Sequence, residues 1–298
     1  MGRAGHIAIK RHYESFSSIS TVSKRWNQFV DYVKDRGIRR MEHIEVEHIR
    51  EYGQTLVDKG YSPASQQNYI SAVNIVLEEA RGDREVRINP TEVAESRILV
   101  ASQNLSTPKH EHEHVIEVLD HRVATLLELQ RSFGLRFEES AKLDAKTALE
   151  QAKQNNTITI EYGTKGGQKR EITLSHDYQI EVLANAAEIQ QDDRSMIPGK
   201  QTYIEFKHEA YNEIRNLEIN FHGERHAYAQ KRYLEITNHI APIEDQDREE
   251  RWIPHLAKQL GIEERQAREL DSAARLQISK ELGHHREDVV SAYLGGKG

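Results

Sequence analysis

Leu282-Gly283-His284-His285-Arg286-Glu287-Asp288-Val289-Val290-Ser291-Ala292-Tyr293-Leu294 is the stretch on which the interpretation of this sequence depends. A leucine–glycine pair precedes two histidines, and Tyr293 follows His284 by nine positions. Alone, the pattern also fits a helix that ends at Gly283, followed by a short helix with a packed tyrosine. Other stretches, upstream in the chain, favour a functional interpretation.

Three upstream stretches carry further charged and histidine side chains. They are Gly134-Leu135-Arg136-Phe137-Glu138-Glu139, Thr164-Lys165-Gly166-Gly167 and His222-Gly223-Glu224-Arg225-His226. Lys165 lies between two alternating runs, 157–161 and 170–174, which predict a β-hairpin with a lysine near its tip. Together the stretches supply two arginines, a lysine, histidines and a late tyrosine, a set of side chains suited to cleaving a phosphodiester.

Each step of metal-free DNA strand cleavage has a candidate residue in this set. Arg136 and Arg225 offer planar, bidentate donors to the negative charge of the transition state. Lys165, on a hairpin that reaches the DNA, is a candidate to protonate the leaving 5′-oxygen. Tyr293 is the candidate nucleophile that forms a covalent intermediate.

The remaining candidates assist these groups. We expect His222 to accept the tyrosine proton, His284 to donate a hydrogen bond to a non-bridging oxygen, and Glu139 to orient an arginine or histidine from behind. His285 is an alternative to His284, and Tyr228 and Tyr233 are alternatives to Tyr293. The order of the motifs favours Tyr293. His222 and His226 as zinc ligands would lack the glutamate spacing of a zinc protease helix.

The sequence resembles the tyrosine recombinases of the phage integrase family. The resemblance is carried, from about residue 115 to 298, by Gly134-Leu135-Arg136-x-x-Glu139, Thr164-Lys165-Gly166-Gly167-x-x-Arg170, His222-x-x-Arg225-His226, Leu282-Gly283-His284 and Tyr293. It implies cleavage and religation through a 3′-phosphotyrosine, without ATP, metal or another cofactor. It also implies a homotetramer on double-stranded DNA sites, with accessory directionality or DNA-bending proteins as further expected partners.

Two other functions remain open from the residues. One is a type IB topoisomerase-like or multimer-resolving enzyme with the same tyrosine chemistry, and the other is a non-catalytic DNA-binding clamp. The formal charge of −7, from 41 Lys and Arg against 48 Asp and Glu, does not favour DNA binding overall, but a basic channel can coexist with an acidic surface. The chain lacks cysteine and any long apolar run, so we expect a cytoplasmic protein. The resemblance to the recombinases implies a nucleoid-associated location in a bacterium.

The predicted fold is mainly α with a small β-hairpin, arranged as the two domains of a tyrosine recombinase. We expect a flexible N-terminal arm over 1–18, a helical core-binding domain over 19–102, a linker over 103–114 and a catalytic domain over 115–298. Apolar periodicity predicts helices over about 20–37, 46–57, 62–82 and 115–133. The basic residues of the first domain fit either a solvated surface or a clamp on the DNA backbone; they are Lys24, Arg25, Lys34, Arg36, Arg39, Arg40 and Lys59.

Two segments have an unusual composition, one rich in histidine and one rich in charged residues. In an extended linker, His110-Glu111-His112-Glu113-His114 would place three imidazoles on one face, where zinc or nickel could bind, but a solvated linker is the simpler interpretation and we assign no metal site. The interval from Arg225 to His284 is longer than in compact members of the recombinase family, so residues 238–273, which are rich in Asp, Glu and Arg, resemble an insertion. Glu224 occupies a position where the recombinases that this sequence resembles usually have an apolar residue, so we expect it to point away from a phosphate site.

Overall fold

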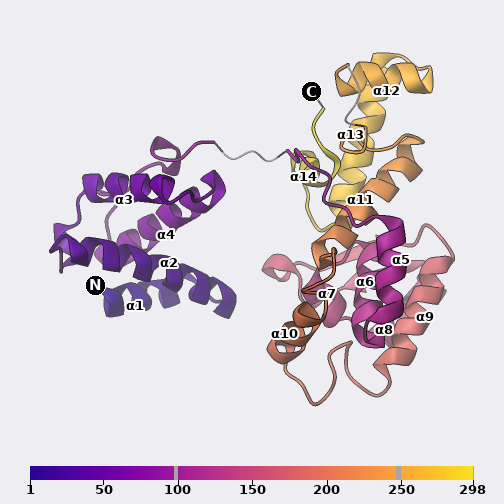
Figure 1. Cartoon of the computed structure of the whole chain (residues 1–298), viewed down its shortest axis with the longest axis horizontal. Helices are drawn as coiled ribbons and strands as arrows, with labels where there is room; N and C mark the ends of the chain where they lie inside the picture. The colour runs from indigo at the N-terminus through magenta and orange to yellow at the C-terminus, as the bar shows by residue number, and fades with distance from the viewer. Residues whose placement is uncertain (97–99, 246–249, 298) are drawn as a thin grey trace. The chain divides into compact units, whose positions relative to one another are not determined.

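The computed structural model describes residues 1–96, 100–245 and 250–297 (Figure 1). It contains two compact units, residues 1–98 and 99–298. The described chain is mainly α-helical with one two-stranded antiparallel sheet, which confirms the predicted fold class. Within these residues, no helix has the length and apolar character needed to cross a membrane.

The first unit is a small helical bundle. Its helices are α1 (Gly2–His12), α2 (Phe16–Asp35), α3 (Val46–Asp58) and α4 (Pro63–Arg81), with short 3₁₀ turns at Met41–His43 and Pro90–Glu92. The Ser62 side chain accepts a hydrogen bond from the Ser65 backbone N–H and Pro63 occupies the first turn, so α4 begins where the sequence predicts. The bundle core includes Trp26, Phe29 and Ile49, all fully buried.

The N-terminal residues do not form the expected arm. Residues Gly2–His12 form α1, which packs against α2 and α4. Ala8 and Ile9 are buried in the bundle core, and a Cβ on Gly5 would lie 2.0 Å from Nε1 of Trp26. The expectation failed because too few apolar residues occur in α1 to produce a clear period, although those present are sufficient for burial on one face.

The second unit contains the remaining helices and the hairpin. Its helices are α5 (Lys109–Val118), α6 (His121–Phe133), α7 (Phe137–Ala141), α8 (Ala145–Asn155), α9 (Tyr178–Gln190), α10 (Tyr203–Glu213), α11 (Phe221–Thr237), α12 (Trp252–Leu260), α13 (Glu264–Glu281) and α14 (Ser291–Leu294). The strands are β1 (Thr157–Ile160) and β2 (Arg170–Thr173), and 3₁₀ turns occur at Lys165–Gly167 and Glu287–Val290.

The segment around residue 114 differs from the sequence prediction. The histidine-rich part of the expected 103–114 linker lies in α5, so its imidazoles do not lie on one face of an extended strand. The predicted 115–133 helix is interrupted after α5, because the Asp120 side chain accepts a hydrogen bond from the Arg122 backbone N–H and starts α6 as a separate helix.

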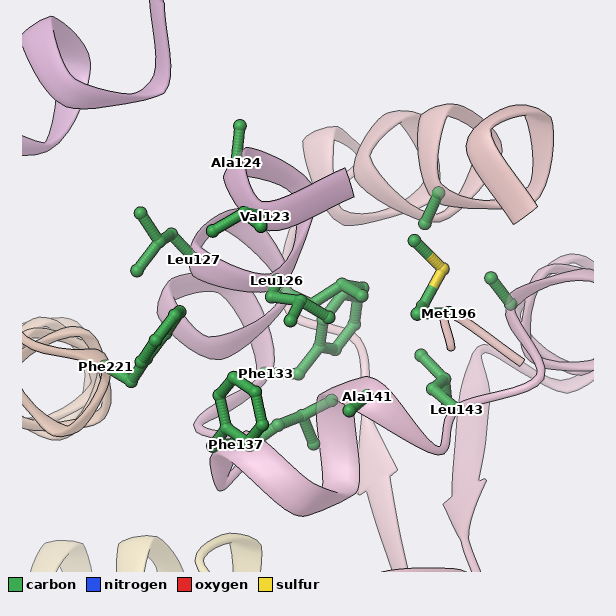
Figure 2. Packing of buried hydrophobic residues seen from close by; sticks show 14 of the residues in the cluster. Val123, Ala124, Leu126, Leu127, Phe133, Phe137, Ala141, Leu143, Met196 and Phe221 are labelled. Atoms are coloured by element: carbon green, nitrogen blue, oxygen red, sulfur yellow. The ribbon is translucent and has the colours of Figure 1, made fainter. Parts of the chain in front are cut away.

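Two apolar cores flank α11 in the second unit. The first core is formed by helices α5, α6, α7, α8, α9 and α10 together with the hairpin. Figure 2 shows its side chains meeting around Leu126 and Phe133, with Phe221 contributed by α11. The other lies between α11, α12, α13 and α14 and includes Trp252 and Leu282. Helix α11 contacts both α6 and α13 and so links the two cores (Figure 1).

The hairpin is antiparallel, with Ile158 opposite Ile172 and Ile160 opposite Arg170. Residues of β2 alternate between buried and exposed, and Arg170 is in phase with the buried Ile172. The alternation of a strand therefore directs an arginine into the protein.

Candidate active site

Arg225, on α11, is the most deeply buried charged group of the site. Its guanidinium donates to three oxygen atoms: the Tyr293 hydroxyl through Nε at 3.2 Å, the Leu282 carbonyl through Nη2 at 2.5 Å, and the Gly134 carbonyl through Nη1. The side chain is 0% exposed, and burial lowers its pKa to about 10. Hydrogen bonds to three separate segments fix the guanidinium in one orientation.

Glu139, in α7, holds the arginines together. Its carboxylate accepts two hydrogen bonds from Arg170, at 2.6 and 2.8 Å, and one from Nη1 of Arg136 at 2.7 Å. Arg225 Nη1 lies 3.8 Å away. Burial alone would raise the pKa of Glu139, but the hydrogen bonds and charges of Arg170 and Arg136 lower it to about 2. One carboxylate among three guanidiniums leaves excess positive charge, which suits an anionic ligand.

Two backbone carbonyls anchor the arginine pair. The Leu282 carbonyl accepts from both Arg225 and Arg136 Nη2, the latter at 3.3 Å. Gly134 ends α6 in the left-handed conformation, with φ of 62°, and a Cβ there would lie 2.5 Å from the Tyr228 ring. The glycine therefore permits the close approach that brings its carbonyl to Arg225.

Tyr293, in α14, points its hydroxyl into this cluster. Its side chain is buried, with a residue exposure of 6%, and the Arg225 guanidinium lies 5.7 Å from the ring centroid. The two alternative tyrosines have other partners. Tyr228 donates to Glu281 at 2.8 Å, and Tyr233 donates to Asp271 at 2.7 Å. Of the three hydroxyls, the one on Tyr293 lies beside the arginines.

Three histidine rings surround the tyrosine. The ring centroids of His226, His222 and His284 lie 4.7, 5.7 and 6.4 Å from that of Tyr293. Burial, followed by the charge of Arg225 and other neighbouring groups, lowers the pKa of His284 to about 4. Burial, then His222 and Arg225, lowers the pKa of His226 to about 4. Desolvation and the charges of Arg225 and Arg136 also lower the pKa of His222, whose ring remains accessible to solvent.

The two adjacent histidines differ in environment. Nε2 of His284 is buried without a hydrogen-bond partner in the described part of the chain, whereas His285 is exposed. His285 instead lines a small surface pocket together with Lys165, Arg136 and Arg170. The unpartnered, buried nitrogen of His284 is therefore the one available to a group placed beside Tyr293 and the arginines.

Lys165 lies at the tip of the hairpin, in the turn Lys165–Gly167. Its side chain is exposed and makes no hydrogen bond or ion pair within the described residues, whereas Lys169 in the same turn region pairs with Glu161 at 2.6 Å. The charge of Lys165 contributes to the lowered pKa of His284. Gly163, two residues before Lys165, has φ of 77°. A Cβ there would lie 2.6 Å from the backbone of Glu138, so the hairpin rests directly on α7.

Comparisons with known proteins identify similar folds. The integrase family model matches residues 95–231. The fold is similar to a lambda integrase (75–356) dimer bound to a COC′ core site, with TM-score 0.58, 13% identity and coverage of 98% of this chain and 96% of that one. It is also similar to the Tn1549 transposon integrase in complex with circular intermediate DNA, with TM-score 0.57, 13% identity and coverage of 99% and 95%. No curated protein sequence matched.

The chain resembles the tyrosine recombinases of the phage integrase family. A third structure, a lambda integrase tetramer bound to a Holliday junction, has TM-score 0.52 and 12% identity and covers 89% of this chain and 75% of that one. The family model and the three solved structures are all described as integrases.

Two residues of this recombinase fold were missed by sequence reasoning. Arg170 belongs to the hairpin motif but received no role, although it makes the two-point contact with Glu139. A charged residue in phase with buried Ile172 was the available signal. His226 belongs to the His222-x-x-Arg225-His226 motif, and its ring is closer to Tyr293 than that of His222. Its position one helical turn beyond His222 was the available signal.

Glu224 points away from the arginine cluster, as expected. It is fully buried, accepts a hydrogen bond from Arg131 at 2.8 Å, and lies 3.0 Å from Nδ1 of His112. His112 therefore has a partner inside the protein, and within the described residues neither His110, His112 and His114 nor His222 and His226 belong to a cluster with metal-ligand geometry.

Proposed function

We propose that this protein is a site-specific DNA recombinase or integrase that cuts and rejoins strands through a covalent 3′-phosphotyrosine at Tyr293. One observation carries the proposal: the Tyr293 hydroxyl lies 3.2 Å from Nε of Arg225, beside a cluster of three arginines that share one carboxylate. A phenolic nucleophile and an anion-binding cluster at the same point are the requirements of attack on a phosphodiester.

Arg136 and Arg225 would bind the non-bridging oxygens of the scissile phosphate. Glu139 and Arg170 act as positioning residues, because their ion pairs fix the arginines rather than meeting the substrate. Nε2 of His284 is a further donor, since this buried atom has no partner in the described structure. Preorganised donors of this kind stabilise developing charge at little reorganisation cost.

The proposed reaction exchanges one phosphodiester for another. The Tyr293 oxygen attacks phosphorus while its proton passes to His222, the P–O5′ bond breaks, and Lys165 gives a proton to the 5′-oxygen. A lowered pKa keeps His222 neutral, and therefore able to accept a proton, at neutral pH. Attack by a 5′-hydroxyl on the phosphotyrosine reverses the steps, so the bond energy is retained and neither ATP nor a metal is needed.

The proposed partner is double-stranded DNA bearing a recombination site, bound by a homotetramer. Neighbours in fold support this, since they are described as a lambda integrase dimer on a core site and a lambda integrase tetramer on a Holliday junction. Accessory directionality or DNA-bending proteins belong to the same proposal, as does a cytoplasmic, nucleoid-associated location in a bacterium. The first unit would be the core-binding clamp and the second the catalytic domain.

Suicide-substrate trapping tests the proposal. Nicked duplexes from candidate attachment sites are incubated with the protein in EDTA, and adducts that resist denaturation are resolved by electrophoresis. We expect an adduct with the wild type and with Tyr228→Phe and Tyr233→Phe, and none with Tyr293→Phe. An adduct that survives in Tyr293→Phe contradicts the assigned nucleophile. DNA binding without an adduct in the wild type would favour the non-catalytic clamp, and relaxation of supercoiled DNA without site dependence would favour the topoisomerase-like enzyme.

A further inference from the structure

A second group of potential ligands lies away from the arginine cluster, in the 238–273 insertion. It comprises His239, just after α11, Asp245 in the following loop, and His255 on α12. Each offers one ligand atom, and these atoms all lie within 4.8 Å of one another. The three side chains are partly buried, and none has a role in the proposed DNA chemistry.

The ring nitrogens of the two histidines differ in their present partners. Nδ1 of His239 lies 3.1 Å from the Ile240 carbonyl, so this nitrogen carries the proton and Nε2 keeps a free lone pair. Nε2 of His255 is buried and forms an ion pair with Oδ2 of Asp245 at 2.7 Å. A metal ion bound between these two side chains would replace their ion pair and displace the proton from Nε2 of His255.

The backbone on either side of the cluster is well supported. Asn238 adopts the left-handed conformation and ends α11, and the Thr237 hydroxyl hydrogen-bonds to both the N–H and the carbonyl of His239. His255 sits on a regular helix and packs against Trp252, with ring centroids 5.7 Å apart. Ligands held on ordered segments lose little conformational freedom when a metal binds.

We propose that His239, Asp245 and His255 bind one zinc ion. Two imidazoles and a carboxylate form a borderline donor set that suits Zn²⁺, with water as the fourth ligand. In a tetrahedral site the ligand atoms lie about 3.3 Å apart, so the His255–Asp245 pair at 2.7 Å must separate and the wider spacings of up to 4.8 Å must close by side-chain rotation. This proposal is independent of the recombinase proposal, because binding can be measured without DNA.

The site has a structural consequence for the segment that carries Tyr293. The backbone N–H of Ile243 donates to the Leu294 carbonyl at 2.9 Å, and that of Trp252 donates to the Lys297 carbonyl at 3.2 Å. Both donors lie in the stretch that the ion would join, between His239 and His255. Zinc would therefore hold together the segment on which the C-terminal residues rest, and would slow hydrogen exchange at the Ile243 and Trp252 amides.

Direct metal titration tests the proposal. The full chain, purified without a polyhistidine tag and stripped with chelator, is titrated with Zn²⁺ by calorimetry and with Co²⁺ by absorption. We expect one ion per chain, tetrahedral Co²⁺ bands displaced by Zn²⁺, and partial quenching of tryptophan fluorescence by Co²⁺, because the rings of His239 and His255 both contact Trp252. At a zinc concentration about 100 times Kd, the melting temperature of this unit should rise by roughly 5 to 10 °C.

Matched variants make the result specific. His239→Gln and His255→Gln keep side-chain size and should weaken binding by about 100-fold or more. His110→Gln/His114→Gln removes two exposed histidines of the other histidine-rich segment and should leave binding unchanged. The proposal is overturned if the full chain binds no Zn²⁺ or Co²⁺, or if binding survives in His239→Gln/His255→Gln. Circular dichroism of each variant before titration identifies any that fails to fold, and Asp245→Asn then serves as the alternative.

Discussion

Arg225 and Tyr293 are joined by a hydrogen bond in which the guanidinium Nε donates to the phenol oxygen at 3.2 Å, although the residues are 68 positions apart. Both side chains are buried. The same guanidinium holds the Gly134 and Leu282 carbonyls, so a single side chain sets the position of α6, the end of α13 and the tyrosine. The proposed nucleophile is therefore positioned by the group proposed to bind the phosphate.

Arg225→Lys should retain a positive charge yet lose most cleavage. A lysine ammonium cannot reproduce the planar set of donors that reaches Tyr293, Gly134 and Leu282. We expect adduct formation to slow by about 100-fold or more. The rate is measured by single-turnover trapping, with thermal melting to confirm folding. A folded variant that cleaves at the wild-type rate would remove Arg225 from the mechanism.

Glu139→Gln should destabilise the second unit at neutral pH by roughly 3 to 5 kcal/mol, because it leaves buried arginine charge without its partner. The pKa of Glu139 is lowered to about 2 from an ordinary 4.5, which corresponds to about 3 kcal/mol of stability. This contribution is complete above pH 4.5 and is lost as pH falls through 2. Urea unfolding at several pH values measures it.

The control for Glu139→Gln is Glu171→Gln, which changes an exposed carboxylate on β2, next to Arg170. It should have little effect at any pH. The difference in unfolding free energy between wild type and Glu139→Gln should narrow as pH falls from 5 towards 2. If the difference in unfolding free energy did not depend on pH, the ion pair with Arg170 would not be the cause of the lowered pKa of Glu139.

His284 should remain neutral well below the ordinary histidine range. Burial and nearby arginines lower its pKa to about 4 from an ordinary 6.5, so it favours folding above pH 6.5 and this contribution is lost as pH falls through 4. Its ring resonances, assigned by comparison with His284→Gln, should titrate near pH 4 in NMR spectra of the free protein. A midpoint near 6.5 would contradict the buried position.

DNA binding should move the same titration upward. A phosphate beside Nε2 favours the protonated ring, because an anion stabilises the charged form. We expect the pKa of His284 to rise when an uncleavable duplex is added to Tyr293→Phe. An unchanged titration in a saturated complex would place the phosphate away from His284.

Lys165→Ala should reduce cleavage without reducing stability. The Lys165 side chain is exposed and has no ion-pair partner among the described residues, so its removal costs little folding free energy. As the proposed acid, it should account for a factor of about 100 or more in the cleavage rate. Lys169→Ala is the matched control, since Lys169 is a neighbouring exposed lysine paired with Glu161. Equal cleavage rates in both variants would exclude a specific role for Lys165.

A 5′-bridging phosphorothiolate substrate separates this role from DNA binding. Its sulfur leaving group departs without an acid, so the substrate should restore cleavage by Lys165→Ala. It should not restore cleavage by Arg225→Lys, whose defect is in stabilising charge on the phosphate. Failure to rescue Lys165→Ala would assign the lysine to binding rather than proton transfer.

Residues close together in the chain were enough to predict the local elements and the candidate site residues. The cap at Ser62, the alternation of the hairpin and the order of the arginine, lysine, histidine and tyrosine motifs depend on residues that are near one another in the chain. These patterns predicted α4, the hairpin and most members of the cluster. They did not predict α1, where the apolar pattern is too short, or the break between α5 and α6.

The pairing of distant groups depends on how the helices pack. The contact of Arg136 with Leu282 spans 146 positions, that of Arg170 with Glu139 joins a strand to a helix, and the insertion brings His239, Asp245 and His255 together. No local period encodes these pairings, because they result from packing α11 between two cores. The sequence thus supplied the reactive groups, and burial fixed their partners, their orientation and their pKa values.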